Sequence, residues 1–435
     1  MKAKKINISD IHDDTPKGTQ SAEMYSAATV SEHRDSTPKS KSKSKLPKII
    51  EENRPLFTVI AISSVLILVS LFSIYQITRY LPKDPPQIIK HTKQYLAAQE
   101  LVITTLPALD APDVPRTETS PLNGKLLTTE ELEEMMERRA VAVMVNNHLE
   151  ARPQSNLQQA DIVYETLAEG GITRLMPLYW SKTPDKVGPI RSARQYFIDW
   201  VREYDAIYLH DGCASADLGG DLRVDACGNL YRQRIKTLTT YGAWRDNSGG
   251  RVAPHNEYTS VEGAVERADE LGWGGFPTTI PAWKFKRDSS LELRGDMTAF
   301  TATFLDRLGA HNGYRYDARW DYDRERNLFV RSTGGSVHED QETDQPLTAK
   351  VVIVQTVDGI QSGDSKGHLI IDTTGEGDAT IFQDGKAQAV RWRKNEETDR
   401  TKYYDNAGNE VELNRGLIWI MAIPDGWGGF DIIAQ

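Results

Sequence analysis

The side chains best suited to bind or react lie between residues 161 and 258, where acids, arginines and histidines stand beside glycine and proline breaks. These breaks separate apolar runs that have the character of buried strands and helices. Loops held by a rigid scaffold commonly carry binding and catalytic groups. We therefore expect a polar ligand site in this segment, built from the following residues: Glu165, Glu169, Arg174, Arg191, Ser192, Arg194, His210, His255 and Asn256.

Three arginines of this set could hold an anion. Arg191 and Arg194 open a predicted helix directly after a Gly-Pro pair, and Arg174 follows a Gly-Gly pair. Backbone N–H groups at a helix start, together with guanidinium groups, suit a carboxylate or a phosphate. The alternative is structural: Ser192 caps the helix, and the arginines pair with the nearby glutamates, as buried arginines normally do.

Acid and base chemistry is a second possibility. Glu165 and Glu169 could serve as the two carboxylates of a glycan hydrolase if their environments differ, but their spacing does not set their separation in space. His210 ends a predicted strand and His255 lies in a Pro-His-Asn turn, and either could act as a general base near neutral pH. A histidine that only hydrogen-bonds a loop backbone is the commoner case.

Metal and cofactor chemistry has little support in the sequence. His210, Asp211 and His255 could converge on an ion, but no HExxH or comparable ligand spacing exists, so we predict no metal site. The chain also lacks a phosphate loop and a dinucleotide fingerprint. We therefore predict no bound cofactor, and the pattern leaves open whether the protein is an enzyme.

Cys213 and Cys227 lie 14 residues apart on the predicted outer side of a membrane. An oxidising compartment permits a disulfide that closes this Gly- and Asp-rich loop. The sequence leaves open whether the bond forms. Two cysteines alone make no zinc site.

One apolar segment indicates the location of the chain. Residues 56–77 contain no charged side chain, and a run of about 20 such residues crosses a bilayer as a helix. We predict a single transmembrane helix at residues 56–78. Lysine and arginine crowd its N-terminal side, which places that side in the cytoplasm and the C-terminal part outside the plasma membrane. A cleaved signal peptide fits less well, because a long polar stretch precedes the apolar run.

Composition and charge divide the remaining chain. Residues 1–55 form a polar cytoplasmic tail that we expect to be disordered, and the proline-rich residues 79–122 should form an extended stalk. The chain has a net charge of −10, yet residues 1–55 hold 11 basic against 8 acidic side chains, so the part beyond them is strongly acidic. That charge argues against nucleic acid as a partner.

The candidate residues need a scaffold, and its pattern changes along the chain. Residues 128–139, 195–203 and 260–271 have the spacing and end residues of helices. Residues 140–147 and 204–210 are apolar runs typical of buried strands. This alternation predicts an α/β domain at residues 123–300.

Beyond that domain the pattern is mostly that of strands. Residues 314–323 alternate between apolar and polar types, and residues 349–357 are apolar. Residues 383–386 and 405–408 have the composition of hairpin connections. A mainly β domain is therefore predicted at residues 301–435.

Several separate blocks resemble the YerB-like lipoprotein family of bacteria. In chain order they are residues 161–174 (DIVYETLAEGGITR), 187–194 (VGPIRSAR), 204–210 (YDAIYLH), 255–260 (HNEYTS) and 403–420 (YYDNAGNEVELNRGLIWI). The resemblance implies an extracytoplasmic, membrane-tethered protein with an α/β part followed by a β part, and it implies no established activity. The chain departs from the family in its anchor, because the predicted transmembrane helix replaces a lipid-bearing cysteine.

The sequence thus predicts a membrane-anchored protein of the bacterial cell envelope that binds a small polar or anionic ligand, such as a cell-wall fragment. In that site the arginines would hold the negative group, the acids would position the arginines or accept ligand hydroxyls, and the histidines would add donors. Two alternatives stay open: an envelope glycan or peptide hydrolase, and a scaffold for another membrane protein. Neither the ligand nor the oligomeric state has a signature in the sequence.

Overall fold

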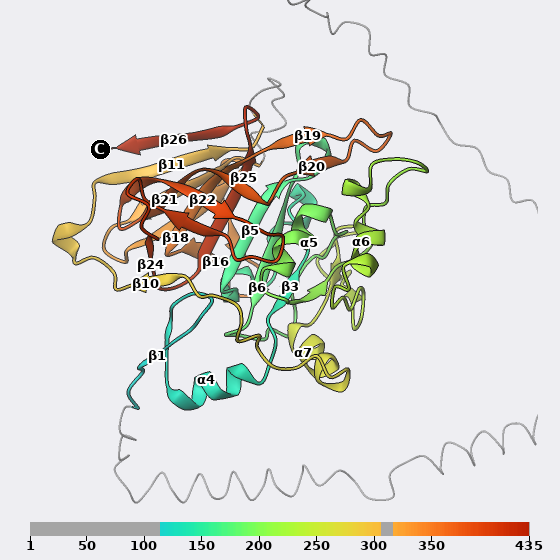
Figure 1. The fold of residues 1–435 in the computed structure, drawn as a ribbon, viewed down its shortest axis with the longest axis horizontal. Coiled ribbons are helices and arrows are strands. Elements are labelled where there is room, and N and C mark those ends of the chain that lie inside the picture. Colours follow the sequence, from blue (N-terminus) through green and yellow to red (C-terminus); the bar gives the residue numbers. More distant parts are fainter. Residues whose placement is uncertain (1–113, 306–315, 435) are drawn as a thin grey trace, which may run out of the picture. The chain divides into compact units, whose positions relative to one another are not determined.

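Figure 1 shows the computed structural model of the protein, which describes residues 114–305 and 316–434. Three predictions lie outside these residues: the cytoplasmic tail 1–55, the transmembrane helix 56–78 and most of the stalk 79–122. Within the described ranges, no helix is long and apolar enough to cross a membrane.

A sheet of ten strands forms the centre of the described part (Figure 1). Three of its apolar strands are buried along their whole length, as expected for strands covered on both faces. The strand order is β23 (Lys402–Tyr404), β22 (Lys386–Lys394), β21 (Gly375–Gln383), β18 (Val351–Val357), β25 (Ile418–Pro424), β5 (Ile162–Leu167), β6 (Thr173–Tyr179), β3 (Val141–Val143) and β7 (Ile207–Leu209), and β4 (Val145–Asn146) also pairs with β6.

This sheet joins the two predicted parts of the chain. β25 lies between β18 and β5 and runs parallel to both, so that Ile418 is opposite Val351 on one side and Ile162 on the other. Parallel neighbours need long connections, and here most of the described chain lies between β5 and β25. Strands from both sides of the predicted boundary near residue 300 therefore share one sheet.

A second sheet of six strands packs against the C-terminal half of the first. Its order is β14 (Ser336–Val337), β13 (Leu328–Thr333), β12 (Ala318–Asp323), β11 (Met297–Thr303) and β26 (Gly429–Ala434), with β17 (Thr348–Ala349) also on β13. Aromatic contacts connect the two sheets: Phe300 stacks on Phe382 with ring centroids 3.7 Å apart, and Trp320 meets Trp419 edge to face at 5.3 Å. Large buried rings of this kind dominate a core energetically.

Five pairs of short strands complete the β structure of the described ranges. They are β1 (Glu118–Thr119) with β2 (Leu126–Leu127), β8 (Trp244–Arg245) with β9 (Glu257–Tyr258), β10 (Lys284–Lys286) with β24 (Glu412–Asn414), β15 (Glu339–Asp340) with β16 (Gln345–Pro346), and β19 (Gly359–Gln361) with β20 (Leu369–Ile371). The architecture is therefore two-part and mostly β.

Four α-helices are described, and all of them precede the C-terminal strands. They are α4 (Thr129–Met136), α5 (Gln195–Arg202), α6 (Ala226–Arg232) and α7 (Val261–Glu270). In Figure 1, α5, α6 and α7 lie at the end of the central sheet that holds β3 and β6, away from β11 and β26. α5 buries Phe197, Trp200 and Val201 on one face, which fixes the loops at its N-terminal end.

The local predictions agree with this structure at several positions. The three predicted helices are confirmed as α4, α5 and α7, and α4 begins with a capping box between Thr128 and Glu131. The hairpin at residues 383–386 is also confirmed, because Asp384 and Gly385 both have positive φ (52° and 66°) between β21 and β22. The helix α6 was not predicted.

Candidate functional site

Glu165 lies in the core rather than in a ligand site. Its carboxylate is fully buried and pairs with the equally buried Arg331, whose Nη2 lies 2.9 Å from it. Trp419 donates from its indole nitrogen to the same carboxylate at 2.9 Å, and Thr173 donates at 3.0 Å. The Arg331 guanidinium also lies over the ring of Trp320. A ligand cannot reach this group, so the prediction that Glu165 contacts one has no support in the structure.

Glu169 is already neutralised by arginines. Arg194 makes two hydrogen bonds to its carboxylate, both 2.6 Å long, and Arg174 lies 3.8 Å from it. Burial alone would raise the pKa of Glu169, but the hydrogen bonds and charge of Arg194 outweigh it and lower that pKa. Both arginines also donate to the backbone carbonyl of Ser192. Arg174 and Arg194 therefore follow the structural alternative given in the sequence analysis, in which the arginines form ion pairs with a glutamate instead of binding an anion.

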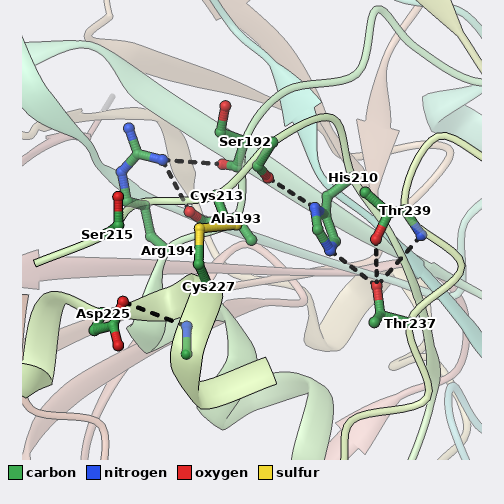
Figure 2. The surroundings of a disulfide bond; sticks show 12 residues. Ser192, Ala193, Arg194, His210, Cys213, Ser215, Asp225, Cys227, Thr237 and Thr239 are labelled. Atoms are coloured by element: carbon green, nitrogen blue, oxygen red, sulfur yellow. Dashed lines mark hydrogen bonds between the residues drawn. A yellow bond between two sulfur atoms is a disulfide. The ribbon is translucent and has the colours of Figure 1, made fainter. Parts of the chain in front are cut away.

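Ser192 is not the cap of the following helix. The N-cap residue of α5 is Arg194, which has extended backbone and makes no side-chain capping bond. Ser192 instead contributes its carbonyl oxygen to the arginine cluster, as Figure 2 shows for Arg194. The predicted helix 195–203 is therefore present as α5, but Arg191 and Ser192 precede it, because they form irregular backbone that pairs with neighbouring loops.

His210 holds a loop in place. Its Nδ1 lies 2.7 Å from the carbonyl oxygen of Gly212, and its Nε2 lies 2.9 Å from the hydroxyl of Thr237 (Figure 2). Burial lowers the pKa of His210. Both ring nitrogens are thus occupied, and His210 has the backbone-bonding role that the sequence offered as the alternative.

The disulfide and Asn256 also serve to hold loops. Cys213 and Cys227 are bonded, which ties the loop after β7 to the first turn of α6 (Figure 2). Asn256 is buried and donates to Asn247 at 2.7 Å, while its carbonyl oxygen accepts from Arg245 at 3.1 Å. Asn256 is therefore committed to neighbouring loop residues rather than free for a ligand.

An open cluster remains at the loops after β4, before α5 and before β9. We call Asn146, His148, Glu150, Arg191 and His255 the Arg191–histidine cluster. The rings of His148 and His255 stack with centroids 4.4 Å apart, and Nε2 of His255 lies 3.2 Å from Glu150. Only Arg191 and His255 of these five were predicted. Asn146 ends the buried strand β4, and His148 and Glu150 follow it in the loop, where function is often carried. That position was the available signal.

Hydrogen bonds fix which nitrogens of the two histidines carry protons. The side-chain oxygen of Asn146 accepts from the backbone N–H of His148 at 2.9 Å, so its NH2 group faces Nδ1 of His255 at 3.0 Å. The backbone N–H of Glu150 donates to Nδ1 of His148 at 3.3 Å. Both Nδ1 atoms are therefore acceptors, and both neutral rings carry their proton on Nε2.

Arg191 is the unpaired arginine of the predicted trio. Its backbone is anchored, because its N–H donates to Met144 at 2.8 Å and its carbonyl accepts from Asp211 at 3.0 Å. Its partly buried side chain makes no hydrogen bond or ion pair within the described ranges. Burial lowers the pKa of His255, and repulsion between two protonated rings and from Arg191 outweighs the attraction of Glu150 and lowers it further. The cluster thus presents one guanidinium and two N–H donors.

The same histidines lie close enough to Glu150 to be considered as metal ligands. The ligand atoms of His148, Glu150 and His255 all lie within 4.8 Å of one another. A metal-bound histidine normally donates from its second nitrogen to an acceptor, whereas here the second nitrogen of each ring accepts. The protonation pattern therefore favours a ligand that offers acceptor oxygens. The predicted His210, Asp211 and His255 trio is not gathered, because His210 bonds elsewhere and Asp211 faces Arg245 at 3.9 Å.

We predicted from the sequence that no Gly-x-Ser-x-Gly elbow is present, yet the pattern itself occurs at residues 363–367. A serine nucleophile of that pattern sits on a strand-to-helix turn, whereas this segment connects β19 to β20. The Ser365 hydroxyl donates to Asp217 at 3.2 Å, and the following His368 pairs with Asp364. The segment is a hairpin connection rather than a nucleophile elbow.

Comparisons with known proteins place this fold in a family. The family model described as “Protein of unknown function (DUF3048) N-terminal domain” matches residues 127–274, and its C-terminal counterpart matches residues 310–420. The chain belongs to the DUF3048 family. The resemblance to the YerB-like family is confirmed, since this DUF3048 chain is 31% identical over 330 residues to the protein of Bacillus subtilis (strain 168) named “Putative lipoprotein YerB”, covering 72% of this chain and 88% of that protein.

A solved structure agrees with the same assignment. The crystal structure of the YerB protein from Bacillus subtilis superposes with a TM-score of 0.61 at 28% identity, covering 72% of this chain and all of that one. This chain therefore contains both DUF3048 domains, and their strands share one sheet. The function of the family is unknown.

Proposed function

We propose that this protein is anchored in the plasma membrane and uses the Arg191–histidine cluster to bind a small anionic or polar ligand of the cell envelope. One observation carries the proposal: the Arg191 side chain makes no hydrogen bond or ion pair within the described ranges and is attracted by Asp211 only at longer range, although Arg174 and Arg194 share Glu169. A lipoprotein relative and a disulfide both support an extracytoplasmic location. The predicted transmembrane helix supplies the anchor in this proposal.

The donors of the cluster match a carboxylate or phosphate. The guanidinium of Arg191 can give two parallel hydrogen bonds to such a group, and the Nε2–H groups of the histidines can complete its shell. Glu150 now accepts from His255, but its side chain is 67% exposed. An incoming anion can therefore replace this carboxylate without disturbing the core.

Replacing Arg191 by alanine is expected to weaken binding about 10- to 100-fold, because a hydrogen bond to a charged group contributes about 1.5–3 kcal/mol. Calorimetric titration with wall-derived glycan fragments, acidic peptides and inorganic phosphate measures the effect. The control is Arg319→Ala on β12, where an exposed arginine pairs with Asp321. Equal binding by wild type and Arg191→Ala, or no binding of any of these probes to wild type, would refute the proposed site.

Binding is expected to strengthen as the pH falls from about 8 to about 5. The pKa of His255 lies below its ordinary value in the free protein, and a bound anion favours the protonated ring. The second proton is on Nδ1, so the Asn146 amide must turn its oxygen toward that nitrogen, and proton uptake then accompanies binding. Glutamine at position 255 keeps a neutral donor but cannot be protonated. His255→Gln should therefore bind at pH 8 nearly as wild type does and lose most of the pH dependence. A pH-independent affinity in wild type would contradict this, and tight zinc binding would contradict the assigned protonation.

The hydrolase alternative gains no support from the carboxylates that suggested it. Glu165 is sealed in the core, and Glu169 is held by Arg194 and Arg174. Incubation of the protein with wall polymer is therefore expected to release no fragments. The scaffold alternative predicts instead that binding partners co-purify with the protein and are retained by the Arg191→Ala variant.

A further inference from the structure

Arg400 is a buried cation without a hydrogen-bond partner. The residue is 3% exposed, and none of its three guanidinium nitrogens makes a hydrogen bond within the described part of the chain. The guanidinium lies over the ring of Trp283 at 3.8 Å and over the ring of Tyr204 at 4.4 Å. Stacking on rings stabilises the faces of the planar group, but its five N–H donors point from its edge and stay unsatisfied.

The buried acid bonded to the residue after Arg400 is occupied by other donors. Glu203 is fully buried and accepts from Lys394 at 3.0 Å. The backbone and hydroxyl of Thr401 donate to the same carboxylate at 3.2 and 2.8 Å. Buried arginines are normally paired, and an unpaired one destabilises the folded state. An unsatisfied guanidinium therefore points to a partner that is not part of the polypeptide.

Two cavities adjoin Arg400. One has a volume of about 440 Å³ and the other about 210 Å³, and Pro281, Asp399 and Arg400 line both. The larger volume lies in the range of small-molecule sites. The turn at residues 396–399, which borders both cavities, is closed mainly on itself, since the backbone N–H of Glu396 donates to the Asp399 carboxylate at 3.1 Å.

Some of the positive side chains around the larger cavity have no ion-pair partner. Arg202 pairs with Glu397, and Lys236 pairs with Asp205 at 2.5 Å. Arg234 is exposed on the same wall and makes no ion pair within the described ranges. Together with Arg400 it gives the cavity two cations that make no ion pair within the described residues, while Asp399 on the same wall accepts only from the backbone N–H of Glu396.

We infer that the cavities around Arg400 form a second binding site, separate from the Arg191–histidine cluster, for a small molecule that carries a carboxylate or phosphate group. The anion takes the edge N–H groups of Arg400, while Trp283 and Tyr204 hold the plane of the guanidinium. Because those nitrogens are covered in the free protein, binding displaces the 396–399 turn, whose outer anchor is the Arg202–Glu397 ion pair. The site thus recognises charge and the planar geometry of the bound group.

The test is thermal melting of the full-length protein in sodium phosphate, sodium acetate or sodium chloride at matched ionic strength. A ligand at about ten times its Kd should raise the Tm of wild type by about 3 °C, with the two anions reporting which group is preferred. Arg400→Met should lose the part of this rise that the Arg191→Ala variant retains, and in chloride it should melt at or above wild type, because an unpaired buried charge has been removed. Arg400→Lys keeps the positive charge but lacks the paired N–H donors of the guanidinium, so the anions should raise its Tm by less than they raise that of wild type.

Two further variants show whether the anion response belongs to Arg400. Arg391→Met, which replaces an exposed arginine paired with Asp378, should keep the full response to anions. Arg191→Ala removes any response of the Arg191–histidine cluster and should keep the response of the Arg400 site, so the two sites can stand or fall independently. A response that survives in the Arg191→Ala variant that also carries Arg400→Met overturns the inference. The inference is also overturned if neither anion raises the Tm of wild type and Arg400→Met lowers the Tm. The aromatic rings alone would then account for the burial of Arg400.

Discussion

Replacing Glu165 by alanine is expected to destabilise the protein by about 3–5 kcal/mol, because it leaves the buried charge of Arg331 without a counter-ion. Both side chains of this pair have no solvent exposure. The change also removes the acceptor of the Trp419 indole and the Thr173 hydroxyl. A loss of this size is a large part of the roughly 5–15 kcal/mol that typically holds a native protein together.

Denaturant unfolding measures the change, and Glu266→Ala is the matched control. Glu266 lies on the exposed side of α7, so its loss should change the free energy of unfolding by less than about 0.5 kcal/mol. The double variant Glu165→Met with Arg331→Met should recover much of the stability, since replacing both charges with apolar groups leaves none unpaired. A loss below about 1 kcal/mol for Glu165→Ala would show that the pair does not have the structural role assigned to it.

Removal of the disulfide in the variant Cys213→Ser with Cys227→Ser is expected to lower the free energy of unfolding by about 3 kcal/mol. The bond closes a loop of 14 residues, and a loop of this length restricts the unfolded chain by about that amount. Ligand binding at Arg191 should weaken as well. The loop bonded by Cys213 pairs with the Arg191 segment, through the hydrogen bond from Ala193 to Gly212 and that from Asp211 to Arg191.

Reductant provides the control for this prediction. Wild type in excess reductant should unfold at the denaturant concentration at which the double serine variant unfolds, and the variant should not respond to reductant. If wild type keeps its full stability when reduced, the bond has no stabilising role. The same experiment relates to location, because a protein that depends on this bond requires an oxidising compartment.

Local patterns in the sequence predicted the elements whose physics is local. The capping box of Thr128 and Glu131 satisfies backbone donors within one turn of α4, and the apolar spacing of α5 predicts its buried face. The Asp384-Gly385 turn follows from the positive φ that its two residues tolerate. The family resemblance was also correct because it depends on local sequence. Each of the blocks that carry it is a contiguous piece of chain, and the blocks occur in the same order.

Pairing between distant strands could not be predicted in this way. β25 was recognisable as an apolar strand, but nothing in its residues indicates that Ile418 lies opposite Ile162. Apolar strands are nearly interchangeable as neighbours, because a sheet bonds through backbone groups that every residue has. Packing of the whole chain selects the neighbour, and it joined the two predicted domains in one sheet.

The sequence by itself determined which residues could do chemistry, the helices and hairpins that carry them, and membership of the family. Only the tertiary structure decided what those residues do. It buries Glu165 in an ion pair with Arg331, which lies 166 positions away in the chain. It also pairs Glu169 with two of the three candidate arginines. It also brought His148 against His255 and left Arg191 unpaired within the described ranges. The physical reason is that the role of a charged group depends on its solvent exposure and its nearest opposite charge, and both are set by contacts between distant segments.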